Sequence, residues 1–433
     1  MSAARALRLL GGVRTTQARY ADAINALSEA YKQSADLVER HPRDEEMIFE
    51  RGQAELGIGF VHWRRAEYPE AGKWLNRYRE TTMALVALDP SRPDWQLEQA
   101  DVEYNLAALS KEHGDLDAAK AAFIAELSTL QRMIAADPGN QELRSREEDT
   151  HNYLGTIADL QGDFPVALEQ YSTQVSQLES LAAADPKTVE WRNYEAIALL
   201  YVVTIEMVTG QYDAASDSLG KAQKLLAALV AHDPKNVEWE GTYMIGRLTE
   251  ASLARRRGDA AEAGRIVDDV MAPIGTIAAD EPADQVFAML LPKAWRLKAQ
   301  LQTSAGDADA AGSAARAVEM GEKRAGARGA SDADAGDCAK SHVISGEIAA
   351  KNGDAAAARK DWLRADELLA ARARTSRDWR ILDPQARAQA WLGRLGEARA
   401  TIARLTTLGY VPIDPWPDLD GLAAAKSSDP QPK

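Results

Sequence analysis

Proline recurs in this chain at a fixed interval of 48 residues, at Pro42, Pro90, Pro138, Pro186, Pro234 and Pro282. The fifth residue after each of them is large and apolar: Met47, Trp95, Leu143, Trp191, Trp239 and Phe287. Glycine keeps the same interval at Gly114, Gly162, Gly210, Gly258 and Gly306. Such a period indicates one supersecondary unit repeated along the chain, with each repeat packed on its neighbours. We therefore expect the 433 residues to form an array, although length alone would suggest two or three compact domains.

The glycines mark one turn in each repeat. Extending their spacing backward gives Ala66 and Ala18, and forward the spacing shortens to Gly353 and then Gly393, so the nine turn positions are Ala18, Ala66, Gly114, Gly162, Gly210, Gly258, Gly306, Gly353 and Gly393. The fifth residue after a turn position is always alanine: Ala23, Ala71, Ala119, Ala167, Ala215, Ala263, Ala311, Ala358 and Ala398. The seventh residue before it is small in eight of nine repeats: Gly11, Gly59, Ala107, Gly155, Val203 (the exception), Ala251, Ala299, Gly346 and Ala386. The ninth residue after it is mostly large: Leu27, Leu75, Phe123, Tyr171, Leu219, Val267, Ala315, Trp362 and Ile402. The pattern predicts two antiparallel helices around each turn, which approach closely at the small residues.

The same landmarks indicate where the helices begin and end. Glycine adopts the left-handed conformation that terminates a helix, and the Asp that follows four of the five periodic glycines can cap the next helix. Asp-Pro pairs such as Asp137-Pro138 are expected to end the second helix, because proline disfavours helical angles in its predecessor and lacks a backbone donor. Apolar residues recur at helical spacing, as at Leu154, Ile157 and Leu160, and no segment alternates as a strand would. The sequence therefore predicts an all-α fold of about nine helix pairs.

These motifs resemble the tetratricopeptide repeat (TPR) family over roughly residues 3 to 405. The resemblance rests on Tyr104-Asn105-Leu106-Ala107 with Gly114-Asp115, Ala119 and Phe123, and on Tyr153-Leu154-Gly155 with Gly162-Asp163, Ala167 and Tyr171. The family period is about 34 residues, so each helix here is expected to be roughly two turns longer. The resemblance implies a right-handed superhelical solenoid. Long repeats with Asp-Pro and a following Trp also resemble arrays attached to bacterial signalling proteins, whose effector motifs are not found in this sequence.

In the TPR family the first helix of each pair lines a concave groove, and three positions around its small residue face that groove. Carried onto this chain, the resemblance gives these candidate groove-binding residues: Phe60, Trp63, Tyr104, Lys111, Asn152, Thr156, Asp159, Thr204, Met207, Ser252 and Arg255. The groove would change from aromatic through polar to basic along the array. We expect it to be exposed, so burial of Trp63 and Tyr104 between helices would exclude this assignment.

The two ends of the chain depart from the regular period. Residues 1–323 are expected to form the 48-residue array, 324–337 a flexible connection rich in Gly, Ala, Ser and Asp, and 338–410 two shorter helix pairs. Residues 411–421 are predicted to be an extended segment that can cap the last pair, and 422–433 a disordered tail. The first helix, from Ala3 to about Gln17, has apolar residues on several faces, so we expect either a preceding domain or a partner to cover it.

Composition excludes several classes of function. Acidic residues outnumber basic ones by 66 to 51, and a net charge of −15 disfavours nucleic acid as a partner. The single cysteine, Cys338, excludes a disulfide framework and any multi-cysteine metal site. No run of 18 apolar residues free of charge occurs, so we expect no direct membrane insertion of this chain. A cytoplasmic location is favoured, with the periplasm as the alternative if a membrane span precedes the chain.

A search for catalytic residues finds no convincing site. None of the six histidines has a second histidine three or four residues away, as a helical metal pair requires. We interpret Cys338 as a bystander thiol rather than a nucleophile, and no phosphate-binding Gly-x-x-x-x-Gly-Lys motif is present. The basic run 255–257 lies before Gly258 and suits the end of a helix, with an anion or acidic-peptide contact as the alternative. We therefore expect no enzyme activity, no cofactor and no metal.

The sequence favours a non-catalytic scaffold or sensor that binds a protein or peptide. Its ligand would be a peptide or partner helix in the concave groove, and the array would belong to a larger bacterial signalling or regulatory protein. The alternative is a sensor for a small ligand or an envelope fragment, gating an attached effector such as a kinase. A closed pocket with polar walls would favour this alternative, whereas an open groove would favour peptide binding.

Overall fold

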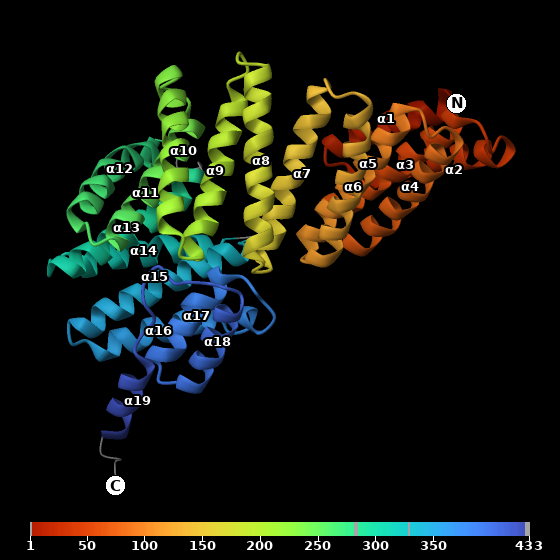
Figure 1. Cartoon of the computed structure of the whole chain (residues 1–433). Coiled ribbons are helices and arrows are strands. Elements are labelled where there is room, and N and C mark those ends of the chain that lie inside the picture. The colour runs from red at the N-terminus through yellow and green to blue at the C-terminus, as the bar shows by residue number, and fades with distance from the viewer. Residues whose placement is uncertain (1, 281–284, 328–329, 429–433) are drawn as a thin grey trace, which may run out of the picture. The chain divides into compact units, whose positions relative to one another are not determined.

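The computed structural model describes residues 2–280, 285–327 and 330–428, and within them the fold is entirely α-helical (Figure 1). The helices in chain order are α1 (Ser2–Thr16), α2 (Tyr20–Arg40), α3 (Glu45–Arg64), α4 (Tyr68–Leu88), α5 (Pro93–His113), α6 (Leu116–Ala136), α7 (Gln141–Leu160), α8 (Phe164–Ala184), α9 (Glu190–Val208), α10 (Tyr212–His232), α11 (Val237–Arg256), α12 (Ala260–Asp280), α13 (Gln285–Ala305), α14 (Ala310–Ala325), α15 (Asp332–Lys351), α16 (Ala355–Leu369), a 3₁₀ turn (Arg372–Arg374), α17 (Trp379–Trp391), α18 (Leu395–Thr407) and α19 (Leu419–Ser428). The helices up to α18 form nine consecutive pairs, which confirms the predicted all-α array.

Two compact units divide the chain, and the boundary falls inside α7. The N-terminal unit comprises residues 1–157 and the C-terminal unit residues 158–433. The expected boundary at 324–337 lies within the second unit. None of the helices in the described part of the chain is long and apolar enough to cross a membrane.

All nine turn positions have positive φ, as the period predicts. The seven glycines among them have φ between 68° and 87°, and the two non-glycine positions, Ala18 and Ala66, have φ of 57° and 58°. At Gly114 the backbone N–H donates to the carbonyls of Lys111 and Ser110, which closes the end of α5. The left-handed residue reverses the chain, so that the second helix of the pair packs back along the first.

The predicted close approach of the two helices in a pair is also present. A Cβ atom at Gly11 would lie 2.5 Å from Leu27 Cγ, and one at Gly346 would lie 2.4 Å from Trp362 Nε1. The residue seven positions before the turn therefore packs directly against the residue nine positions after it. The alanines five positions after the turn are fully buried, except for Ala311.

The expectation for Ala311 is wrong, because α14 begins later than the other second helices. Most second helices begin two residues after the turn position, whereas α14 begins at Ala310, four residues after Gly306. This shift rotates Ala311 to the surface, and Ala310 and Ala314 are buried in its place.

The Asp-Pro pairs end the second helices as expected. The residues Asp89, Asp137, Asp185 and Asp233 are the C-caps of α4, α6, α8 and α10. Beyond the first of these, Trp95 is buried against Val38, Ile48 and Leu85, so it packs between neighbouring repeats. Pro282 and the side chain of Phe287, the last members of the series, lie outside the described residues.

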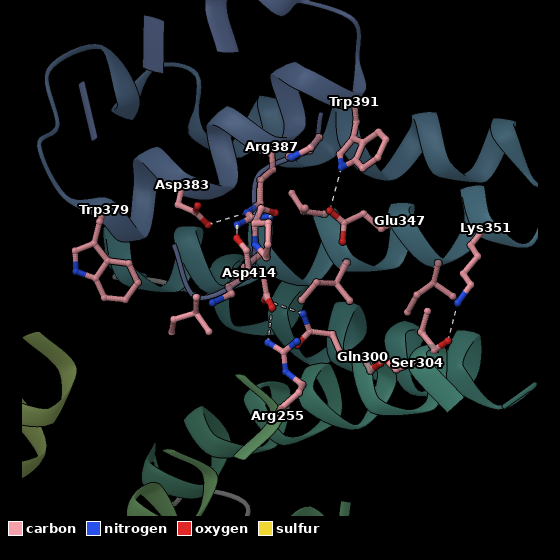
Figure 2. A pocket seen from close by; sticks show the side chains of 18 of the residues that line it. Arg255, Gln300, Ser304, Glu347, Lys351, Trp379, Asp383, Arg387, Trp391 and Asp414 are labelled. Carbon is pink, nitrogen blue, oxygen red and sulfur yellow. Dashed lines mark hydrogen bonds and ion pairs between the residues drawn. The ribbon is translucent and has the colours of Figure 1, made fainter. Parts of the chain in front are cut away.

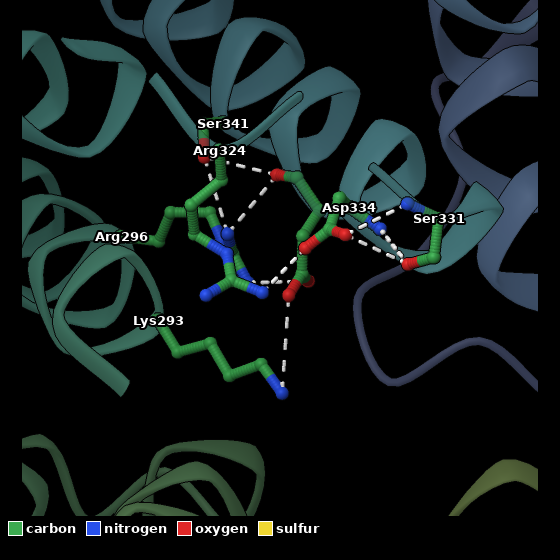
Figure 3. A network of polar contacts seen from close by, with 7 residues as sticks. Lys293, Arg296, Arg324, Ser331, Asp334 and Ser341 are labelled. Atoms are coloured by element: carbon green, nitrogen blue, oxygen red, sulfur yellow. Dashed lines mark hydrogen bonds and ion pairs between the residues drawn. The ribbon is translucent and has the colours of Figure 1, made fainter. Parts of the chain in front are cut away.

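Residues 332–337 of the segment predicted as a flexible connection are helical (Figure 3). Helix α15 begins at Asp332, where Ser331 and Asp334 form a capping box: Ser331 Oγ accepts from Asp334 N at 3.2 Å, and Asp334 Oδ2 accepts from Ser331 N at 2.9 Å. Asp337 pairs with Arg296 at 3.0 Å, which ties this helix to α13. A Gly-, Ala- and Asp-rich stretch is compatible with a helix start, because Ser and Asp are preferred N-caps.

The last residues also differ from expectation. Residues 411–418 are not helical, as predicted, but 419–428 form α19 where the sequence predicts the end of a cap and a disordered tail. Asp418 explains the start of this helix, because its carboxylate accepts from the N–H groups of Asp420 and Gly421. Residues 429–433 lie outside the described residues.

The strained turn at Ala66 gives a test of the repeat geometry. We expect Ala66→Gly to stabilise the chain by about 0.5–1 kcal/mol, because glycine adopts positive φ without the steric cost that alanine incurs. Ala84→Gly, at an exposed site inside α4, is the matched control and should destabilise by a similar amount. The shift of the urea unfolding midpoint measures both, and shifts of the same sign would contradict the assignment.

Candidate functional site

The C-terminal unit closes on itself through contacts between its first and last helices. Phe164 and Tyr171 of α8 share a buried core with Ile381 and Leu382 of α17 and with Tyr410. A Cβ atom at Gly162 would lie 2.7 Å from Leu408 Cδ1, so this turn and the end of α18 touch. This closure brings the non-helical segment 411–417 onto the first helices of several pairs.

Residues 411–417 lie across the surface formed by α9, α11, α13, α15 and α17, which we call the first-helix face. The Val411 N–H donates to the Val208 carbonyl at 2.7 Å, which satisfies a free acceptor at the end of α9. Ile413 packs against the cluster that contains Val203 and Met207. The segment thus makes both main-chain and apolar contacts with α9.

Asp414 is the charged anchor of this segment. Its two carboxylate oxygens accept from Arg255 Nη2 at 2.5 Å and from Gln300 Nε2 at 3.1 Å, so α11 and α13 hold the same side chain (Figure 2). Burial acts to raise the pKa of Asp414, but Arg255, Lys340 and Arg387 outweigh it and hold that pKa below its ordinary value. The contribution of this ion pair to stability is therefore present at neutral pH and lost as the pH falls through the lowered pKa.

Arg387 of α17 holds the main chain of the same segment. Its guanidinium donates to the carbonyl of Pro415 at 3.0 Å and to the carbonyl of Asp414, while Nε pairs with Asp383 at 3.0 Å. Asp383 in turn accepts from the Trp416 indole N–H at 2.9 Å. Arg387 thus binds two consecutive main-chain carbonyls of a non-helical segment, and Asp383 binds the Trp416 side chain that follows them.

Beside the segment lies a cavity of about 380 Å³ (Figure 2). One face of α15 and one face of α17 form its main walls, with α11, α13 and residues 413–417 completing it. The charged and aromatic residues that line it are Arg255, Lys340, Glu347, Lys351, Trp379, Asp383, Arg387, Trp391, Tyr410 and Asp414. Glu347 Oε1 accepts from Trp391 Nε1 at 3.0 Å, and burial raises the pKa of Glu347.

In the N-terminal unit, the predicted groove residues remain accessible. Phe60 is 38% exposed and stacks on Trp63 with 5.7 Å between ring centroids, and both line a surface hollow with Glu112. Trp63 is half-buried and donates its indole N–H to Glu112 Oε2 at 2.5 Å. Tyr104 is half-buried as well, with its hydroxyl 3.1 Å from that of Tyr153.

The other predicted residues of this unit lie on α5 and α7. Lys111 places its ammonium over the Tyr153 ring, 4.9 Å from the centroid, and burial lowers the pKa of Lys111. Asn152 and Thr156 are half-buried on α7.

In the C-terminal unit, several predicted groove residues contact the chain's own C-terminal part. Asp159 pairs with Arg380 and accepts from Trp379 Nε1 at 3.2 Å, Met207 lies in the cluster against Ile413, and Arg255 binds Asp414. Thr204 and Ser252 donate their hydroxyls to carbonyls one turn earlier in their own helices, both at 2.9 Å.

Sequence reasoning missed the residues that come from the C-terminal part. The groove pattern covers only the regular repeats, so it does not reach Lys340 and Glu347 of α15 or Asp383 and Arg387 of α17. The i, i+4 spacing of Trp379, Asp383, Arg387 and Trp391 is a signal that could have grouped them on one helix face.

A second cluster joins Glu322, Cys338 and His342, whose ligand-type atoms lie within 4.8 Å of one another. Both ring nitrogens of His342 are engaged, by Glu322 at 2.9 Å and by Asp361 at 2.8 Å. Arg364 binds Glu322 and lowers the pKa of that carboxyl to about 2. Burial raises the pKa of the Cys338 thiol to about 12. This protonated thiol beside an occupied carboxylate is a poor nucleophile and a poor metal ligand, so we interpret the cluster as a structural ion-pair network.

Comparisons with known proteins show the fold. No family model and no curated protein matches the sequence. Among solved structures, aspartyl phosphate phosphatase F from Bacillus subtilis has 10% identity over 77% of this chain and 73% of its own, with a TM-score of 0.51. A tetratricopeptide repeat protein from Parabacteroides merdae has 17% identity over 73% and 93%, with a TM-score of 0.40. The Rap conjugation gene regulator of plasmid pLS20, in complex with the Phr* peptide, has 11% identity over 82% and 96%, with a TM-score of 0.46. The chain has a TPR-like helical repeat fold, built of consecutive helix pairs.

The attachment of residues 411–417 can be tested by hydrogen exchange of the full chain. We expect Asp414→Ala to increase exchange of the Val411 amide by about tenfold or more, because it leaves the part-buried Arg255 without its anion. Asp420→Ala is the matched control, since it removes an exposed pair with Arg399 that contributes little. Equal exchange at Val411 in the two variants would show that Asp414 does not hold the segment.

Proposed function

We propose that this chain is a non-catalytic scaffold or sensor that binds an extended peptide or a partner helix along its first helices. One observation carries the proposal: the first-helix face of the C-terminal unit holds a non-helical stretch of polypeptide, residues 411–417 of the same chain. A surface that binds a non-helical internal segment has the chemistry to bind a similar external peptide. The TPR-like fold supports the same mode of binding, because its paired helices form continuous surfaces.

The internal segment suggests what kind of peptide fits. Arg255 and Gln300 bind a carboxylate, Arg387 binds two consecutive main-chain carbonyls, and the cluster around Val203 and Met207 accepts an aliphatic side chain. The matching ligand is an extended peptide with an aliphatic residue followed directly by an acidic one. An acidic ligand is selected by local positive charge here, although the chain as a whole carries −15.

A peptide with the sequence of residues 409–418 tests this binding mode directly. The substitutions Asp414→Ala and Trp416→Ala in the full chain weaken the attachment of its own residues 411–417. We expect the labelled peptide to bind this variant about tenfold more tightly than it binds the unmodified chain. The control peptide carries Asn in place of Asp414 and should bind about tenfold more weakly, since it lacks the charge that pairs with Arg255. Fluorescence anisotropy measures both. Hydrogen exchange shows whether residues 411–417 are released in this variant. If they are released and the peptide still does not bind, the proposal is refuted.

The N-terminal unit offers the surface for a separate partner. In its described residues no extended segment covers Phe60 and Trp63, and Lys111 lies on the first helix of the next pair. Exposed stacked aromatics are typical anchors of protein interfaces. We propose that this surface recruits the partner protein and that the chain acts within a larger bacterial signalling protein, as its sequence resemblance implies.

A peptide library displayed against the full chain tests the N-terminal surface. We expect enriched peptides to lose about tenfold or more in affinity on Phe60→Ala, because truncation removes half of an aromatic anchor pair. Met83→Ala is the matched control, since Met83 is 54% exposed but lies on α4, the second helix of its pair. Peptides that respond equally to both substitutions, or to neither, would place the binding surface elsewhere.

The cavity of the C-terminal unit supports a second candidate function, the sensing of a small ligand that gates an attached effector. Its volume of about 380 Å³ falls in the range of small-molecule sites. Polar and aromatic side chains converge on it from α15 and α17 (Figure 2). A ligand bound there would contact both these helices and the segment 413–417.

A further inference from the structure

We propose that the cavity of the C-terminal unit binds a small organic monoanion, a carboxylate attached to a planar apolar group, with Lys340 as its ion-pairing residue. The inference deepens the small-ligand function proposed above and rests on it. It is carried by the balance of charges in the cavity wall and by the two tryptophans of α17.

Most of the charged groups in the wall already have partners. Arg255 binds Asp414, Arg387 binds Asp383, and Lys351 donates to the Thr303 carbonyl at 2.7 Å. Lys340 differs from them: it lines the cavity, and no acceptor among the described residues lies within hydrogen-bonding or ion-pair distance of its ammonium. Lys340 thus remains for a ligand to neutralise at the half-buried part of the wall, while Lys351, bound only to a neutral carbonyl, is exposed to solvent.

The surroundings of Lys340 limit the ligand to a single negative charge. Asp337, Asp383 and Asp414 lie near enough to act on it electrostatically, but each of them is bound by an arginine. Burial lowers the pKa of Lys340, so a bound carboxylate would restore the charged form that the cavity disfavours. A second negative charge would face these carboxylates and Glu347, with only the solvent-exposed Lys351 to offset it.

The apolar part of the ligand has a preformed place. Trp391 stacks on Trp362 with 5.3 Å between centroids, and its N–H is fixed by Glu347. Trp379 stacks on Tyr410 with 5.8 Å between centroids, and its N–H is fixed by Asp159. Both indole planes are therefore held before any ligand arrives, which reduces the entropy lost on binding. Aliphatic residues of α15, including Ile344 and Ile348, line the space beside them.

Calorimetric titration of the full chain with three ligands that differ mainly in charge tests the proposal. Indole-3-acetate is the anion, indole-3-ethanol the neutral compound and tryptamine the cation, with benzoate as a smaller carboxylate. We expect a carboxylate to bind about tenfold or more tightly than the neutral and cationic compounds, as a charge-assisted contact requires. Binding of the neutral or cationic compound alone would overturn the inference but leave the small-ligand function standing. Failure of all four ligands at millimolar concentration would overturn both.

Variants of Lys340 assign the charge to one residue. Lys340→Met keeps the length of the side chain and should weaken carboxylate binding about tenfold or more, whereas Lys340→Arg keeps the charge and should retain binding. Lys360→Met is the control, because Lys360 is exposed on α16 away from the cavity wall. Thermal unfolding shows that each variant is folded, and Lys340→Arg provides the test if Lys340→Met is not. Unchanged carboxylate affinity in Lys340→Met, or lost affinity in a folded Lys340→Arg, would refute the role of Lys340.

Discussion

Helix pairs along the array depend on one close approach, as at Gly11, Gly59 and Gly346, in which a small residue on the first helix meets a large residue on the second. At Gly346, where any side chain would collide with Trp362, the approach leaves no space for a Cβ atom. The turn enforces this register, because a left-handed residue at a fixed position sets which faces of the two helices meet. A buried side chain of this size contributes about 1.5–3 kcal/mol, so repetition of the contact stabilises the array along its length. Where α14 begins two residues late, the buried alanine changes as well, which shows how closely turn and packing are linked.

In the C-terminal unit, the last helix pair packs back against the first helices of the unit. The turn at Gly162 meets Leu408, and Asp159 receives both Arg380 and Trp379, so helices about 220 residues apart in the chain share one core. A closed unit shields the surface that an open array would present to a partner. The same closure positions α17 opposite α13 and α15, and this arrangement forms the cavity and brings Arg387 to the main chain of residues 414 and 415.

The periodic part of this structure could be predicted from the sequence, and the closure could not. Three features depend only on residues near one another in the chain: the turn positions, the close approach of paired helices and the helix ends at Asp-Pro. The sequence of each repeat is therefore sufficient to predict them. The predicted groove residues Met207 and Arg255 do contact the non-helical segment 411–417, but nothing in the repeat pattern identifies Ile413 and Asp414 as what they contact. Contacts between distant segments arise from the accumulated rotation of successive pairs, which small differences in helix length and crossing angle change. The capping box at Ser331 was missed for another reason: composition suggested a linker, whereas the placement of Ser and Asp three residues apart specifies a helix start.

The internal segment 411–417 lowers the affinity of the C-terminal unit for an external peptide. A segment joined to its site by a short connection acts at a high effective concentration, of millimolar order for short flexible linkers. An external peptide with the same contacts must overcome that advantage, so a covered first-helix face binds partners more weakly than an exposed one of equal chemistry. A ligand in the cavity would add to this advantage, because it contacts α15 and residues 413–417 together and so favours the state in which the segment is bound. By linkage, whatever releases the segment must weaken binding in the cavity by the same factor, which makes peptide and small ligand antagonists within this unit.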